Sequence, residues 1–174
     1  MYKKLSLLLA LVLLSPSAAL AVGSKKAAYV GGTAPAFKDA KKVVEGQLVT
    51  SDEKELKFVY NKTETFAIPY EQIIDLEYGK KSGRRVGTAV ATTVLLGPIG
   101  LLSLMSKKQK HYLTVGYKDG AGKDQVAVFE LGKDIFRTTL AVVETRAGKK
   151  IEYQDKKDEK KAEKEAKKEA EKGN

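Results

Sequence analysis

The chain has 174 residues, no cysteine and a formal net charge of +10 at pH 7, because 32 Lys and Arg residues outnumber 22 Asp and Glu residues. The absence of cysteine excludes a disulfide framework and any thiolate metal site. Residues 80–112 carry seven Lys and Arg residues and no acid. We therefore expect this region, rather than the chain as a whole, to meet an anionic surface.

The first 21 residues are predicted to be a signal peptide. Lys3 and Lys4 precede the apolar stretch 5–14, and the small-x-small sequence at 19–21 is typical of a cleavage site. The apolar stretch is shorter than the roughly 20 residues that span a bilayer. We expect export to the periplasm or cell envelope, with a mature chain that starts at residue 22.

Residues 22–42 are rich in small residues, and Gly31-Gly32 and Pro35 break regular structure, which predicts a flexible leader. Short β segments follow. Leu56, Phe58 and Tyr60 alternate within the second of them, and Ile74, Leu76 and Tyr78 are expected on one face of the fourth. The predicted strands are 43–50, 55–61, 65–68, 72–78, 112–117 and 125–131, with a hairpin turn at 119–123 and a short last pairing at 151–153.

A helix is predicted to begin at Asp134 and to stop at Gly148. Its apolar residues recur at four, three and four positions, which gives one stripe: Phe136, Leu140, Val143 and Ala147. Residues 154–174 form a tail of Lys, Glu, Asp and Ala. The tail has no apolar face wider than alanine, so we expect a solvated helix that frays.

These elements predict a mainly β (α+β) fold: a bent sheet or small barrel of about six strands, closed by the C-terminal amphipathic helix. The pattern Ile68-Pro69-Tyr70-x-x-Ile73-x-x-Leu76-x-Tyr78, with its later strands and helix, resembles the pleckstrin-homology-like (PH-like) fold. It is similar to exported bacterial proteins with an apolar insert between such strands. The resemblance covers 43–153 and implies ligand or membrane binding without chemistry. It carries over no cofactor and no functional residue.

The apolar insert is a charge-free run of 20 residues, 86–105. As a helix it is about 30 Å long, the thickness of a bilayer's hydrocarbon core. A single pass would put strands of one sheet on opposite sides of a membrane. The bend at Gly97-Pro98 instead predicts a helical hairpin, with arms 86–96 and 99–105, whose ends return to the same side.

Basic residues flank the run and are predicted to contact headgroups of anionic lipid: Lys80, Lys81, Arg84, Arg85, Lys107, Lys108 and Lys110. The residues predicted to enter the membrane are Val94, Leu95, Leu96, Gly97, Pro98, Ile99, Leu101, Leu102 and Leu104. Gly83, Gly87 and Ala91 form a small-residue ridge suited to close helix contact. Tyr78 and Tyr112, at the edges of the insert, fit strand positions or an interfacial belt.

Three other interpretations of the insert remain open. It can fold back as a core helix, it can be buried in a homo-oligomer of a self-assembling structural protein, or its basic flanks can bind an anionic polymer. Export and the mixed-charge tail disfavour nucleic acid. His111 is the only histidine and has no companion metal ligand or base in the sequence, so we expect a structural role for it, no metal and no enzymatic activity.

Overall fold

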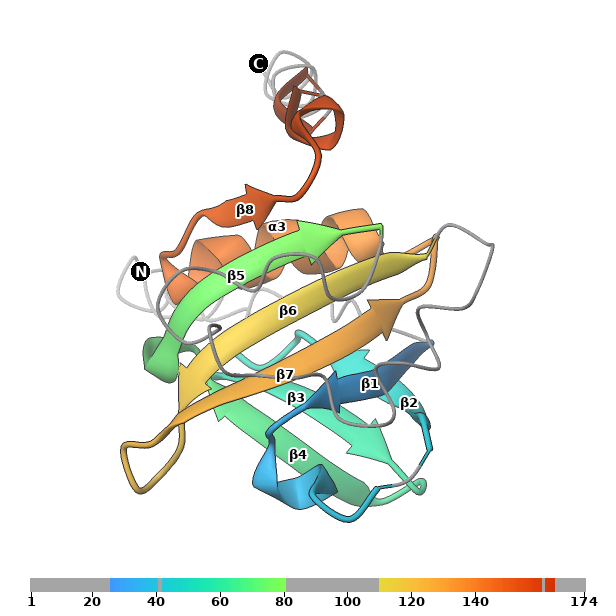
Figure 1. The fold of residues 1–174 in the computed structure, drawn as a ribbon, viewed down its shortest axis with the longest axis vertical. Coiled ribbons are helices and arrows are strands. Elements are labelled where there is room, and N and C mark those ends of the chain that lie inside the picture. Colours follow the sequence, from blue (N-terminus) through green and yellow to red (C-terminus); the bar gives the residue numbers. More distant parts are fainter. Residues whose placement is uncertain (1–25, 41, 81–109, 161, 165–174) are drawn as a thin grey trace, which may run out of the picture.

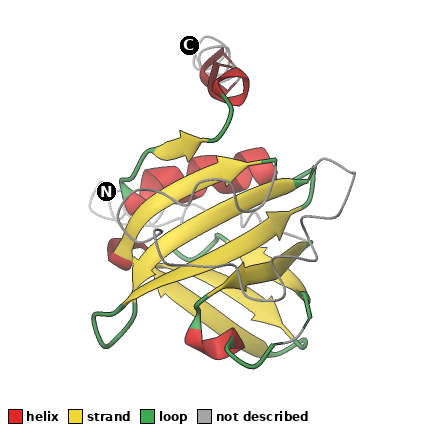
Figure 2. Ribbon diagram, in the orientation of Figure 1, coloured by secondary structure: helices red, strands yellow, loops and turns green. Residues whose placement is uncertain are grey.

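The computed structural model describes residues 26–40, 42–80, 110–160 and 162–164. This part of the chain is mainly β, with eight strands in one mixed sheet in the order β4-β3-β2-β1-β7-β6-β5-β8 (Figures 1 and 2). Only β5 and β8 pair in parallel among these strands. The strands are β1 Ala27–Gly32, β2 Val44–Val49, β3 Glu55–Tyr60, β4 Glu64–Pro69, β5 Ile73–Gly79, β6 His111–Lys118, β7 Asp124–Leu131 and β8 Ile151–Tyr153. The helices are η1 Pro35–Phe37, η2 Tyr70–Gln72 and α3 Phe136–Ala147.

The six strands predicted from alternation are present as β2 to β7, and the short last pairing is β8. Of the two forms expected, a bent sheet or a small barrel of about six strands, the barrel is not supported, because the sheet has eight strands and β4 and β8 stand at its two unpaired ends. The sheet is nevertheless strongly bent. Phe66 on β4 and Tyr117 on β6 are in ring contact at 6.1 Å between centroids, although four strands separate β4 from β6 in the sheet order.

The predicted leader is wrong from residue 27 onward. Residues 27–32 form β1, which pairs with β2 and β7 in the middle of the sheet. Tyr29 is 1% exposed and stacks on Phe37 of η1 at 4.2 Å between centroids. β1 consists mostly of alanine and glycine. These small residues give no strong hydropathy signal, so the strand is not recognised from the sequence.

The main core lies on one face of the sheet, which we call the inner face. It contains Phe58, Leu76 and Phe129, and the stripe of α3 packs against it through Leu140 and Val143. Phe136 and Ala147, the other two stripe residues, are partly buried against the same core. The predicted stripe is therefore confirmed, and Gly148 ends the helix with the left-handed φ of 61° that favours glycine.

One predicted face is wrong in detail. The pairing of β5 with β6 shifts between Ile73 and Asp75, as in a β-bulge. As a result Ile73, rather than Ile74, is buried on the inner face with Leu76 and Tyr78. A bulge adds one residue to a strand and reverses the alternation on one side of it, which a period of two cannot predict.

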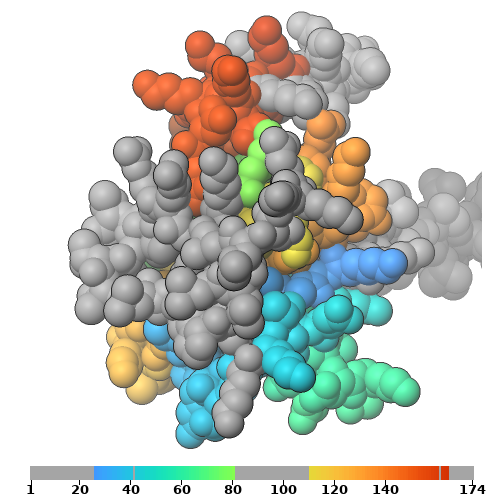
Figure 3. Space-filling view, turned by 45° about the vertical axis from the view of Figure 1, so that its right-hand side comes forward, coloured from blue at the N-terminus to red at the C-terminus, as the bar shows by residue number. Residues whose placement is uncertain are grey.

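The described part of the chain starts at β1, in the middle of the sheet, and continues past β8, which is at one end of the sheet. Residues 156–160 and 162–164 are helical, as predicted for the start of the tail. Figure 3 shows these residues at one end of the molecule and strands β2 to β4 at the other. No helix formed by the described residues is long and apolar enough to span a bilayer. The run 86–105, with its predicted hairpin, lies outside the described residues, as do the predicted signal peptide and residues 165–174.

Candidate functional site

The two ends of the apolar connection leave the sheet side by side. β5 and β6 are antiparallel neighbours, and Gly79 is paired with Tyr112 across them. Paired Cα atoms in such a ladder are about 4.5–5.5 Å apart. We call residues 78–80 and 110–112 the neck, since the chain between them starts and ends at this one place in the fold (Figure 1). A connection of this kind cannot cross a bilayer once, because it would then end on the far side.

Two of the seven basic residues predicted to meet headgroups are described, and each is held by a carboxylate. Lys80 Nζ donates to Asp158 Oδ1 at 2.6 Å, and Lys110 Nζ donates to Glu130 Oε2 at 2.7 Å. The hydrogen bond to Glu130 raises the pKa of Lys110. Both lysines are thus paired with acids of the fold, while their side chains stay 36% and 32% exposed.

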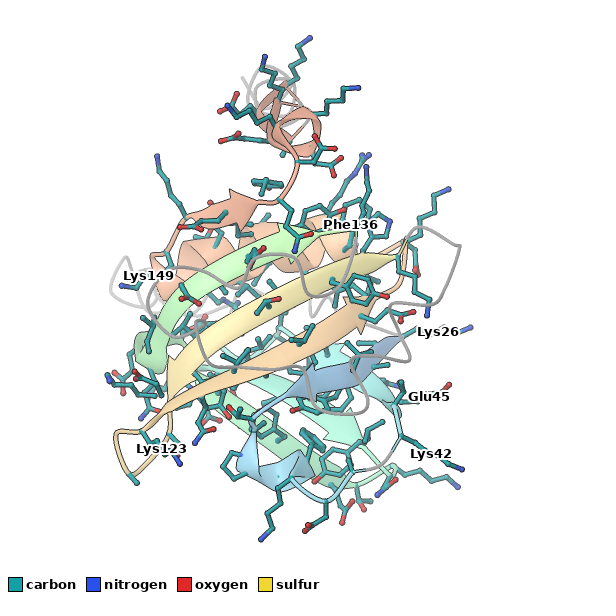
Figure 4. The ribbon with its side chains drawn as sticks, viewed as in Figure 1. Lys26, Lys42, Glu45, Lys123, Phe136 and Lys149 are labelled. Carbon is teal, nitrogen blue, oxygen red and sulfur yellow. The ribbon has the colours of Figure 1, made fainter. Side chains whose placement is uncertain are left out.

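His111 lies in an aromatic stack at the neck. Its ring is parallel to that of Phe136, with 3.7 Å between centroids, and its Nδ1 is 2.6 Å from the Tyr78 hydroxyl oxygen. Phe136 begins α3, so the stack joins this helix to β5 and β6 (Figure 4). Burial lowers the pKa of His111, and the nearby Lys80 ammonium lowers it further. The imidazole is held neutral at pH 7 as a packing element of the neck.

The other sequence-predicted site residues lie outside the described residues. These are the headgroup candidates Lys81, Arg84, Arg85, Lys107 and Lys108, the insertion candidates Val94, Leu95, Leu96, Gly97, Pro98, Ile99, Leu101, Leu102 and Leu104, and the helix-contact candidates Gly83, Gly87 and Ala91. Of the two tyrosines considered for an interfacial belt, Tyr78 is 3% exposed in the main core. Tyr112 is 4% exposed and belongs to a second cluster.

That second cluster lies on the outer face of the sheet, opposite the main core. We call its three valines, Val30, Val126 and Val128, the outer strip; they are 1%, 0% and 2% exposed and pack with Tyr112 and Ala28. Side chains alternate along a strand, so the intervening residues of β1 and β7 face the main core. These central strands are therefore apolar on both faces.

Sequence reasoning missed the outer strip, although a signal for it was present. A strand buried on both faces has a nearly continuous apolar run instead of an alternating one. Residues 126–129 (VAVF) have this character, yet they were interpreted only as part of a hairpin strand. The continuous run is the feature that predicts cover on both sides of β7.

Acidic residues lie beside the outer strip on β5. Asp75 and Glu77 alternate with Leu76 and so point to the outer face, where Glu77 is only 5% exposed. The Asp75 carboxylate lies over Gly116 of β6, since a Cβ on that glycine would come within 2.2 Å of Asp75 Oδ1. Burial raises the pKa of Asp75, and the nearby carboxylates of Glu152 and Asp124 raise it further. A hydrogen bond from the backbone of Gly116 lowers this pKa, but the net shift is upward.

The neck is the place where the apolar connection leaves and rejoins the sheet. Beside it, the outer face carries the apolar outer strip and the partly buried acids Asp75 and Glu77. In the described parts of the chain, no three His, Cys, Asp or Glu side chains gather as a set of metal ligands. Comparison of the chain with protein-family models and with curated protein sequences finds no match, so its function is inferred from the chemistry of these residues.

Proposed function

We propose that this protein is a non-enzymatic module of the cell envelope that docks on a membrane through the connection between β5 and β6. The pairing of Gly79 with Tyr112 supports the proposal, because the connection that contains the 20-residue apolar run starts and ends beside this one pair. A run that starts and ends together can enter a lipid surface as a hairpin while the strands on either side remain paired. The PH-like resemblance, which implies membrane or ligand binding, fits this function.

The headgroup contacts are assigned to five of the seven flanking basic residues. Lys80 and Lys110 are engaged by Asp158 and Glu130 and fix the neck. Lys81, Arg84, Arg85, Lys107 and Lys108 then provide the attraction to anionic lipid, at about 1 kcal/mol for each charge near such a surface. The insertion residues, centred on Leu95, Leu96 and Ile99, provide the apolar contact.

Flotation with lipid vesicles tests the proposal. The chain from residue 22 is mixed with neutral vesicles or with vesicles that contain acidic lipid, alongside a variant in which a Gly/Ser linker replaces 86–105. We expect the parent chain to float, more strongly with acidic lipid, and the linker variant to stay at the bottom. A linker variant that still floats with folded β structure would overturn the proposal.

A charge variant separates headgroup contact from general basicity. Gln replaces Arg84, Arg85, Lys107 and Lys108 in one protein. The matched control makes the same change at four exposed lysines outside the connection, Lys42, Lys62, Lys123 and Lys149, three of which Figure 4 labels. We expect the first variant to lose its preference for acidic vesicles and the control to keep it. Oligomers of the parent chain in lipid-free buffer would favour the self-assembling alternative instead.

A further inference from the structure

We propose that the outer face of the sheet is the docking surface for the connection 81–109 of the same chain, with the outer strip receiving part of its apolar run. This inference goes beyond membrane docking, since it concerns where the connection is seated on its own fold and holds in the absence of lipid.

The first argument is burial without a described cover. Val30, Val126 and Val128 are at most 2% exposed, whereas a valine on an uncovered sheet face is open to water. The described helices do not supply the cover. The buried residues of α3 belong to the main core on the inner face, and Figure 1 shows α3 behind β5 and β6 when the outer face is turned to the viewer.

The second argument is the outline of the covered area. On β2, the strand next to β1, alternation places Glu45, Gln47 and Val49 on the outer face; Glu45 and Gln47 are exposed and Val49 is partly buried. The burial therefore begins at β1 and extends through β7 and β6 toward β5, the strand at which the connection leaves the sheet. A cover that is confined to the neighbourhood of the neck is expected from a segment that is tethered there.

The third argument is reach. The connection between Lys80 and Lys110 has 29 residues and both of its ends lie at the neck. Four strands at a spacing of about 4.8 Å are about 15 Å across. Half of the connection, as a helix that rises 1.5 Å per residue, extends about 20 Å. The chain is long enough to cross the strip and to return to β6.

The fourth argument is charge complementarity. The connection has five basic residues, Lys81, Arg84, Arg85, Lys107 and Lys108, and no acid. The outer face beside the neck presents Asp75 and the buried Glu77. Opposite charges attract across this short distance, so the positive charge of the tethered connection favours this face of the sheet.

The strip covers only part of the apolar run. Three valines and one tyrosine make a narrow surface, whereas the run has 20 residues. One side of the seated connection can therefore pack on the sheet while its other side stays available to lipid. Packing of the connection on the sheet and docking of the protein on a membrane are separate properties, and different experiments test them.

Thiol labelling in lipid-free buffer tests the proposal. The chain contains no cysteine, so Val128→Cys adds a single reporter on the outer face. Val115→Cys is the matched control, because Val115 is 0% exposed on the inner face of the adjacent strand β6. Each is labelled with an uncharged maleimide, in the chain from residue 22 and in the variant with the Gly/Ser linker in place of 86–105.

We expect Val128→Cys to react slowly in the parent chain and at least about tenfold faster in the linker variant, and Val115→Cys to react slowly in both. Equal rates for Val128→Cys in the two backgrounds would overturn the proposal. The mass of the labelled species is measured by light scattering. Protection in a monomer supports the same chain as occupant, and protection found only in an oligomer overturns it in favour of a second copy.

Circular dichroism checks that the linker variant keeps its β structure. If it does not, the comparison uses a chain of natural length in which Leu95, Leu96, Leu101 and Leu102 are changed to Ser, with the same two reporters. The expected and contrary outcomes are the same. Flotation with vesicles is a separate readout, so a failure of the seating can be told from a failure of membrane docking.

Discussion

Lys80 and Asp158, which are 78 positions apart, are joined by a 2.6 Å hydrogen bond between the end of β5 and the C-terminal helical residues. The Asp158 side chain is only 13% exposed, so the contact is partly shielded from solvent. The tail was expected to be a solvated helix that frays, because it lacks an apolar face. The structure adds one contact to that expectation, since this ion pair joins the start of the tail helix to the neck.

Asp158→Asn is expected to release the tail helix while the sheet stays folded. The Lys80 side chain is 36% exposed, so loss of the pair should lower the free energy of unfolding by no more than about 1 kcal/mol. Hydrogen exchange of residues 156–164 should accelerate clearly, because helical residues with few apolar contacts open locally. Glu159→Gln changes an exposed neighbour and serves as the control. Equal exchange in both variants would show that the ion pair does not fix the tail.

The neutral His111 ring predicts a specific dependence of stability on pH. Burial lowers the pKa of His111 in the folded chain below its unfolded value of about 6.5. Between these two pKa values the unfolded chain binds more protons, so stability is full above pH about 6.5 and falls as the pH drops toward the folded pKa. His111→Gln should remove this part of the acid slope. Urea unfolding at a series of pH values measures it, and an unchanged slope in the variant would contradict the prediction.

Phe37→Ala is expected to destabilise the fold severely. Phe37 is 6% exposed, stacks on Tyr29 and has edge contacts with Phe58 and Phe66. Truncation of a buried phenylalanine costs about 3–5 kcal/mol, through lost burial and the cavity that remains. Lys38→Ala, at the exposed next position, is the control and should change stability little. Thermal unfolding separates the two; a flexible leader would make both substitutions harmless.

Most of the sheet could be predicted because its strands carry a local signal. Leu56, Phe58 and Tyr60 recur at every second position, and two of the three residues on the other face, Glu55 and Lys57, are charged; a strand with one face in water shows this kind of alternation. The α3 stripe has the same local origin. β1 could not be predicted in this manner, since its residues Ala27, Ala28 and Gly31 are small and its burial depends on pairing with β7, which is distant in the sequence, as well as with β2.

The position of the neck in the chain could be predicted from the sequence, whereas the side-chain contacts within it could not. The positions of Lys80 and Lys110 beside the apolar run follow directly from the sequence. Their partners Asp158 and Glu130 come from a tail and a strand that only the fold brings close. The stack of His111 on Phe136 likewise needs α3 to return to the ends of β5 and β6, and no spacing along the chain contains that information.

Arg146 offers the last test, at the end of α3 away from the neck. Its guanidinium donates to the carbonyl oxygens of Thr50 and Asp52, which lie more than 90 residues earlier, and its charge lies 5.8 Å from the centre of the Tyr70 ring. Hydrogen bonds from a charged group contribute about 1.5–3 kcal/mol, so Arg146→Met should lower the free energy of unfolding by about that amount.

Arg146→Lys distinguishes charge from geometry at this site. A lysine keeps the positive charge but lacks the planar fork that reaches two carbonyl oxygens at once. We therefore expect Arg146→Lys to be destabilised nearly as much as Arg146→Met, and Lys149→Met, at an exposed position three residues later, to unfold like the parent chain. Full recovery by lysine in thermal unfolding would mean that charge alone, and not the bridge to the β2–β3 connection, stabilises this end of α3.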